Sequence, residues 1–217
     1  MRTAYRGKLK TLNEELICMG EEITQAIRNT LKALKTHDPI LAQEIVNKDQ
    51  AIDDSEKRIE TLCLHLLLTE QPVASDLRII SSALKLITDM ERIGDFAADV
   101  AEIILHGGRS KTGYCISFIS EMGEAVVEMV EGAVRSFVEE DAILARRVCD
   151  ADDRVDDLFS GAREVLVGKI REDEEFAERA LDLMMVSKYL ERIGDHATNV
   201  AEWTIYAVTG VHENTEK

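Results

Sequence analysis

Apolar residues recur every three or four positions along almost the whole chain, which is the spacing of one face of an α-helix. The first expected helix covers residues 3–36, and its apolar stripe consists of Leu12, Leu16, Met19, Ile23, Ile27, Leu31 and Leu34. Aromatic residues make up only 5% of the chain and prolines number two, so packing of long aliphatic helices is favoured over a sheet-rich fold.

Turn residues divide the first half into three helices. Asp38-Pro39 is typical of a helix N-cap followed by the first helical residue, and it predicts a second helix from 39 to about 68. Glu70-Gln71-Pro72 predicts a turn, after which a third helix is expected over roughly 73–107. The polar, glycine-containing segment 108–113 predicts a linker.

The second half repeats this plan. Met19-Gly20 reappears as Met122-Gly123 at an offset of 103, and residues 90–103 match residues 190–203 at nine of fourteen positions at an offset of 100. The turn before the last helix is therefore expected to be three residues shorter in the second half.

These patterns predict an all-α protein with six long helices. We expect two tandem three-helix bundles, residues 1–108 and 113–217, related by pseudo-twofold symmetry. A unit of this size can bury its own core, so two copies suffice without a longer solenoid.

The net charge of −16 narrows the possible partners. Nucleic-acid binding needs a basic surface that neutralises phosphates, so we expect none. The negative charge also disfavours direct attraction to an anionic membrane. An acidic surface instead favours cations and basic patches on partners.

The cysteines and the apolar segments indicate a cytoplasmic protein. No two cysteines have the C-x-x-C spacing, and we expect reduced, mostly buried thiols, with disulfides as the less favoured alternative, at Cys18, Cys63, Cys115 and Cys149. The N-terminus has no apolar signal core, and no apolar run has the ~18–20 residues that a membrane span needs.

The duplicated motif Glu-Arg-Ile-Gly-Asp carries the candidate chemistry. Glu91 and Asp95 lie four residues apart, so they share one helix face, which Asp99 extends. The equivalent face in the second half contains Glu191, Asp195 and Asn199. No basic residue is evident at the next position of either stripe.

Aspartates of the preceding helix add to each set. If the second and third helices are antiparallel, Asp53 lies level with Glu91, and Asp49 lies level with Asp95. Asp152 and Asp156 fall near the matching level in the second half. Each bundle would then place about four carboxylates across one groove.

Such carboxylates repel one another unless they are protonated or bridged by cations. Oxygen-only ligation suits hard ions, and clustered carboxylates can bridge two or more of them. The simpler alternative is an acidic, solvated helix face. No Glu-x-x-His pair of the di-iron type is present, and His196 is expected to have a surface or packing role.

Neighbouring residues suggest further roles. Gly94 and Gly194 stand in mid-helix, where each costs about 1 kcal/mol relative to alanine, so they serve either close helix packing or the site itself. Arg92 and Arg192 are placed to form ion pairs with the carboxylates.

The chain resembles the PhoU family of phosphate-uptake regulators. The similarity rests on Glu-Gln-Pro-Val-Ala-Ser-Asp-Leu-Arg at 70–78, on Met-Glu-Arg-Ile-Gly-Asp at 90–95, and on Leu-Glu-Arg-Ile-Gly-Asp-His-Ala-Thr-Asn-Val-Ala-Glu at 190–202. The resemblance covers nearly the whole chain. The second half lacks the turn sequence of residues 70–78, so a role tied to that turn is expected only in the first.

The resemblance implies a multinuclear metal cluster in each repeat, marked by the motif E/D-x-x-x-D, which falls on Glu91 and Asp95 and on Glu191 and Asp195. Iron is the foremost expectation, with manganese, magnesium, calcium or zinc as alternatives. It further implies restraint of phosphate import and phosphate-starvation signalling through contact with the ATPase subunit of the phosphate ABC transporter and a sensor histidine kinase. A homodimer is also expected.

Two other functions remain open at this point. A metal-dependent phosphoester hydrolase would use clustered carboxylates to position two metals, but no Gly-rich phosphate loop and no evident base accompany the motif. A purely structural helical protein would need no metal. We therefore expect a non-enzymatic regulatory adaptor.

Overall fold

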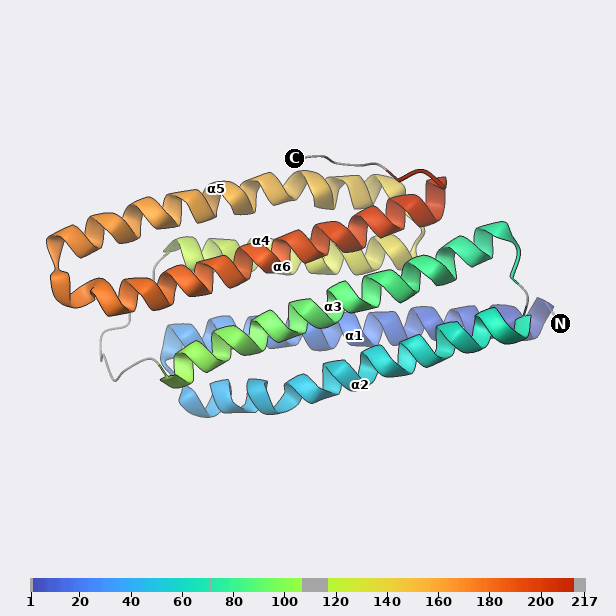
Figure 1. Cartoon of the computed structure of the whole chain (residues 1–217), viewed down its shortest axis with the longest axis horizontal. Coiled ribbons are helices and arrows are strands. Elements are labelled where there is room, and N and C mark those ends of the chain that lie inside the picture. Colours follow the sequence, from blue (N-terminus) through green and yellow to red (C-terminus); the bar gives the residue numbers. More distant parts are fainter. Residues whose placement is uncertain (1, 71, 107–116, 213–217) are drawn as a thin grey trace.

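The computed structural model describes residues 2–70, 72–106 and 117–212, and this part of the chain is helical without any strand (Figure 1). The first repeat consists of α1 (Arg2–Thr36), α2 (Pro39–Glu70) and α3 (Ala74–His106). The second consists of α4 (Ser117–Val138), α5 (Ala142–Glu172), the 3₁₀ turn η1 (Glu174–Phe176) and α6 (Ala177–Thr209). The first three helices agree with the predicted ranges within two residues, whereas the predicted linker 108–113 lies outside the described residues.

Equivalent aspartates cap the second helix of each repeat. Asp38 Oδ1 accepts hydrogen bonds from the backbone amides two and three residues further on, both at 3.0 Å. Asp141 does the same at 2.9 and 3.0 Å. The chain reaches each cap through a residue of positive φ, 51° at His37 and 54° at Glu140. The predicted N-cap is therefore confirmed, and the same turn is used twice.

The six helices pack with α1, α3, α4 and α6 inside and α2 and α5 on opposite outer sides (Figure 1). Within the described helices, α2 contacts only α1 and α3, and α5 contacts only α4, α6 and η1. The repeats join through α3 against α6 and α1 against α4. Buried apolar side chains from all six helices form one continuous cluster, so the two bundles share a core.

Glycines at equivalent positions allow α1 and α4 to approach closely. A Cβ on Gly20 would lie 3.1 Å from the nearest side-chain atoms of Val134, and a Cβ on Gly123 would lie 2.4 Å from Leu31 Cδ1. Both the glycines and their partners are related by the offset of 103. The contact is thus made twice, as pseudo-twofold symmetry requires.

Two sequence expectations are wrong. The connection from Glu172 to Ala177 is no shorter than that from Glu70 to Ala74. Instead α6 begins at the position equivalent to Leu77, because η1 replaces the first helical turn.

The second correction concerns the cysteines. Cys18 is exposed, although the thiols were expected to be mostly buried; Cys63 is buried and Cys149 is half-buried. These three thiols are free, as predicted. Cys115 lies outside the described residues.

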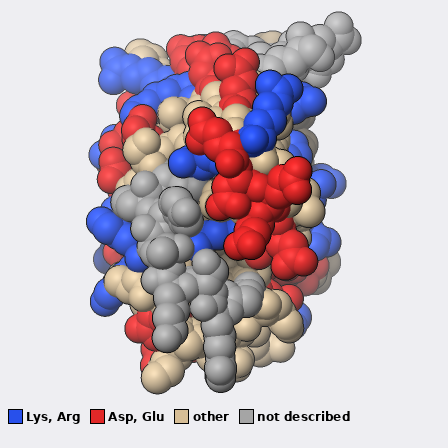
Figure 2. All heavy atoms as spheres, turned by 90° about the vertical axis from the view of Figure 1, so that its left-hand side faces the viewer, with Lys and Arg blue, Asp and Glu red and all other residues tan. Residues whose placement is uncertain are grey.

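The surface carries many acidic side chains, as the net charge implies. Acidic side chains gather in a band on the end of the molecule seen in Figure 2, with lysines and arginines at its sides. None of the described helices combines the length and the apolar character needed to cross a membrane.

Candidate metal centres

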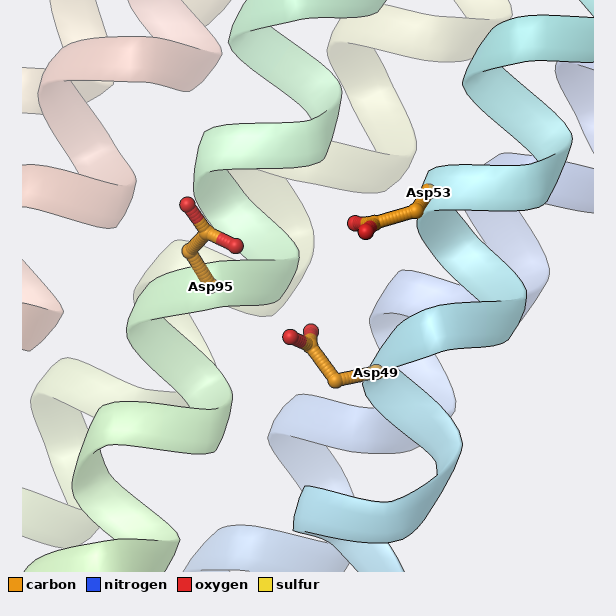
Figure 3. A group of neighbouring side chains, drawn as sticks. All are labelled: Asp49, Asp53 and Asp95. Atoms are coloured by element: carbon orange, nitrogen blue, oxygen red, sulfur yellow. The ribbon is translucent and has the colours of Figure 1, made fainter.

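Three aspartates meet in the groove between α2 and α3: Asp49, Asp53 and Asp95 (Figure 3). One carboxylate oxygen from each lies within 4.8 Å of those of the other two. Asp49 and Asp53 stand one turn apart on α2, and Asp95 faces them from α3. The antiparallel register expected from the sequence therefore places these three side chains together.

The spacing of these oxygens fits a hard cation. Metal–oxygen distances of 2.0–2.6 Å put ligand oxygens on opposite sides of one ion roughly 4–5 Å apart. The three oxygens lie within 4.8 Å of one another, which is close to the spacing that one shared ion requires. Carboxylate-only donors suit magnesium, calcium, manganese or iron.

The electrostatics of Asp49 show how crowded this groove is. Burial, followed by the negative charges of Asp95, Asp53, Asp99 and Glu102, raises the pKa of Asp49 from 3.8 to about 6. A carboxylate that resists ionisation because of like charges is one whose charged form a cation stabilises.

Two further predicted residues flank the three aspartates on α3. Burial and then the charge of Asp95 raise the pKa of Glu91, while Arg92 opposes the rise. Burial also raises the pKa of Asp99, opposed by a hydrogen bond from Tyr189 of α6. Glu91 thus lies near the charge of Asp95 but outside the three-oxygen group. Asp99 also lies outside that group and takes part in the contact between repeats.

Gly94 lets α2 and α3 approach at this level. A Cβ on Gly94 would lie 2.9 Å from Ile52 Cδ1 and 3.1 Å from its Cγ2. Ile52 immediately precedes Asp53, and Gly94 immediately precedes Asp95. Close packing explains this mid-helix glycine, and the packing in turn sets the distance between the two aspartates.

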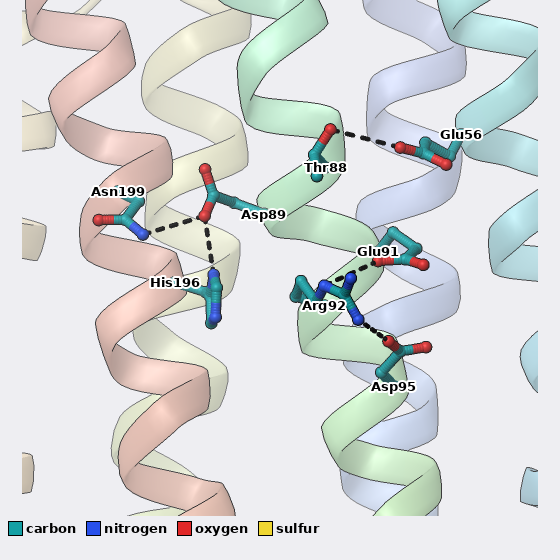
Figure 4. A network of polar contacts seen from close by, with 8 residues as sticks. All are labelled: Glu56, Thr88, Asp89, Glu91, Arg92, Asp95, His196 and Asn199. Carbon is teal, nitrogen blue, oxygen red and sulfur yellow. Dashed lines mark hydrogen bonds and ion pairs between the residues drawn. The ribbon is translucent and has the colours of Figure 1, made fainter.

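Arg92 pairs with the carboxylates as predicted. Its Nη1 lies 2.8 Å from Asp95 Oδ2, and its Nε lies 3.6 Å from Glu91 Oε2 (Figure 4). Arg192 differs, because its guanidinium lies over the ring of Phe96, 5.6 Å from the ring centroid. The two equivalent arginines therefore have different partners.

The second repeat also gathers its predicted carboxylates. Burial raises the pKa of Asp195, followed by the charges of Glu191 and Asp152, with Asp156 contributing further. Asp152 is only 4% exposed. Within the described residues, however, the close three-oxygen arrangement occurs in the first repeat and not here.

The second glycine makes room for a carboxylate. A Cβ on Gly194 would lie 3.2 Å from Asp152 Oδ1. In the first repeat the nearest neighbour of Gly94 is the apolar Ile52, whose equivalent Val155 lies 3.5 Å from the Cβ position of Gly194.

Sequence inspection missed a cation at the second cluster. Lys188 Nζ lies 2.6 Å from Glu191 Oε1 and 2.5 Å from Oε2, so a basic residue from the preceding turn neutralises Glu191, although none stands at the next position of the stripe. The signal was a lysine three residues before a glutamate, a spacing that brings helical side chains together.

Asn199 does not take the predicted place of a ligand. Its Nδ2 donates to Asp89 Oδ1 of α3 at 2.9 Å, because this side of α6 faces the other repeat (Figure 4). His196 Nδ1 lies 2.7 Å from the same oxygen, and its ring lies 5.5 Å from that of Phe96. His196 thus has the expected packing role, and Asp89, which the sequence did not single out, organises the contact between repeats.

Comparisons with known proteins agree with this architecture. The family model described as "PhoU domain" matches residues 16–104 and again residues 119–204. A phosphate-specific transport system accessory protein PhoU homolog from Clostridium acetobutylicum is 37% identical over 96% of this chain and 96% of its own length. The homolog from Pseudomonas aeruginosa is 36% identical over 95% of this chain and 86% of its length.

Solved structures give the same result. The crystal structure of PhoU from Pseudomonas aeruginosa has a TM-score of 0.88 at 36% identity, covering 95% of this chain and all of that one. The phosphate transport system regulatory protein PhoU from Streptococcus pneumoniae has a TM-score of 0.89 at 25% identity, covering 97% and 99%. With two matches to the domain model and relatives that span nearly its whole length, the chain belongs to the PhoU family.

Proposed function

We propose that this chain is a metal-binding cytoplasmic adaptor that restrains phosphate import and phosphate-starvation signalling through protein contacts, without catalysing a reaction. The single observation that carries the metal part is the convergence of Asp49, Asp53 and Asp95 oxygens within 4.8 Å. The regulatory part is supported by relatives named as accessory proteins of phosphate-specific transport.

A metal ion in this groove would act as a cross-link between helices. Asp49 and Asp53 lie on the outer helix α2, while Asp95 lies on the inner helix α3. An ion bound to all three fixes the outer helix against the core and removes the repulsion between the carboxylates. Metal loading would thereby set the form of α2 that a partner meets.

The proposed partners are the ATPase subunit of the phosphate ABC transporter and a phosphate sensor histidine kinase. The acidic surface, with its net charge of −16, favours basic patches on either protein. Contact with the membrane would come only through these partners, and we propose that the chain acts as a homodimer.

The test combines partner capture with metal analysis of the same sample. Tagged protein is recovered from cells grown in high and low phosphate, as the wild type, Asp95→Asn and Asp54→Asn. Asp54 is a matched control because it adjoins Asp53 but is outside the three-oxygen group. Its Oδ1 lies 3.9 Å from Lys57 Nζ instead. Wild type and Asp54→Asn should carry metal and bring down the ATPase subunit or the kinase, and Asp95→Asn should lose metal and partner.

Each failure has its own meaning. Equal metal content in Asp95→Asn and wild type would show that Asp95 is not a metal ligand. Metal loss without any change in partner recovery would show that partner binding does not depend on the metal. Recovery of neither partner would remove the adaptor role, and turnover of phosphoesters by the metal-loaded protein would favour a hydrolase.

A further inference from the structure

We infer that Lys188 is a tethered cation that occupies the second acidic cluster, so that the two repeats bind metal with unequal affinity. The inference rests on the proposed metal-binding function and concerns how its two sites differ. It assigns a specificity-determining role to a residue outside the acidic motifs.

The contacts of Lys188 place its charge inside the groove between α5 and α6. Its ammonium bonds both carboxylate oxygens of Glu191, at 2.6 and 2.5 Å. The glutamate side chain is only 13% exposed and the lysine side chain 37%, so water screens the glutamate end of this pair weakly. On the other side the ammonium lies 5.3 Å from the ring centroid of Phe159 on α5, within the range of a cation–π contact.

The first repeat has a different pair at the same place. The equivalents of Lys188 and Phe159 are Thr88 and Glu56, and Thr88 Oγ1 donates to Glu56 Oε1 at 3.4 Å (Figure 4). Going from the first repeat to the second, threonine to lysine adds one positive charge and glutamate to phenylalanine removes one negative charge. The two sites thus differ by two charges at one pair of positions.

Metal binding through Glu191 must break this ion pair. In the first repeat no lysine stands at this position, and the cation beside the cluster is Arg92, which pairs with Asp95 at 2.8 Å. Charged hydrogen bonds of this kind correspond to about tenfold or more in a binding constant. We therefore expect Lys188 to weaken Mn²⁺ binding at the second cluster about tenfold.

The test measures Mn²⁺ binding by titration calorimetry and by electron paramagnetic resonance of the free ion. All variants are made in the full chain with Asp95→Asn, which removes the first site and leaves the second to report. Lys188→Thr, alone or with Phe159→Glu, gives the second repeat the pair of the first. Lys35→Thr is the control, because it removes the same charge from an exposed position at the end of α1.

Lys188→Thr should raise Mn²⁺ affinity about tenfold, with a further rise on adding Phe159→Glu, and Lys35→Thr should leave it unchanged. Unchanged affinity in Lys188→Thr, or an equal rise in Lys35→Thr, would overturn the inference. The reciprocal change Thr88→Lys, made with Asp195→Asn, should weaken the first site by the same factor, which keeps the test decisive if Lys188→Thr fails to fold.

The Asp195→Asn protein also separates this inference from the proposed function. If its first repeat binds Mn²⁺ while Lys188→Thr changes nothing in the second, only the tethered-cation inference fails. If the first repeat binds no Mn²⁺ at all, both fail.

Discussion

Arg28 on α1 forms an ion pair with Glu131 on α4, the residue at its own equivalent position in the second repeat, with Nη2 2.8 Å from Oε1. Phe96 and His196 are likewise equivalent and face each other across α3 and α6. The pseudo-twofold axis therefore passes between the members of both pairs. Each pair joins two different residues at one equivalent position, and in the first pair two arginines or two glutamates would repel each other.

Removing the axial ion pair should cost little. Arg28 and Glu131 are about half exposed, at 52% and 48%, and exposed pairs contribute about 0–1 kcal/mol. We expect Arg28→Ala to lower the free energy of unfolding by no more than about 1 kcal/mol in urea titrations, because the shared core holds the bundles together. A loss above about 2 kcal/mol would mean that this pair organises the interface.

Gly94→Ala should weaken the first metal site through packing alone. The new methyl group would lie 2.9 Å from Ile52 Cδ1 and push α2 away from α3. We expect a loss of about 1–3 kcal/mol in unfolding free energy, partly offset by about 1 kcal/mol of alanine helix propensity, together with weaker Mn²⁺ binding.

Gly161→Ala is the matched control for this substitution. Gly161 is also in a helix, but a Cβ there meets nothing within 4 Å. Its replacement should stabilise the protein by up to about 1 kcal/mol and leave metal binding unchanged. Identical behaviour of the two variants would contradict the packing argument.

Acidification should stabilise the metal-free protein through protonation of Asp49. Because the pKa of Asp49 is raised to about 6 from 3.8, the folded state binds its proton more tightly than the unfolded chain does. This stabilisation is fully present below about pH 4 and is lost as the pH rises through about 6. In the presence of chelator, the melting temperature of Asp49→Asn should rise less between about pH 7 and about pH 5 than that of wild type. An equal rise in both proteins would refute this prediction.

Chelation should lower the melting temperature of metal-loaded wild type. An ion that binds only the folded state at a hundred times its Kd adds about 2.7 kcal/mol. The double variant Asp49→Asn with Asp95→Asn should show a smaller chelator effect, and its metal-free form should melt above metal-free wild type because two repelling charges are gone. Differential scanning calorimetry of both proteins checks each part, and an equal chelator effect in both would count against the site.

The helices and the first site were accessible to sequence analysis for a physical reason. Helical periodicity fixes which side chains share a face, and a capped turn at Asp38 fixes where α2 begins. Counting residues along each helix from the turn between them was then enough to predict that Asp49 and Asp53 lie opposite Asp95.

The contacts of Asn199 and Lys188 could not be predicted in the same way, because the pattern of a single helix does not show how the helices pack. Asn199 was expected at a metal site, but the packing of α6 on α3 turns it toward Asp89. Lys188 was overlooked because only residues further along the acidic stripe were considered, while its charge comes from the preceding turn.

The most direct test of the central claim is an anomalous difference map from crystals of Mn²⁺-loaded protein. We expect a peak in the groove between α2 and α3, about 2.0–2.6 Å from carboxylate oxygens of Asp49, Asp53 and Asp95, and absent in Asp95→Asn crystals. Manganese bound elsewhere on the protein, with no density between these three aspartates, would contradict it.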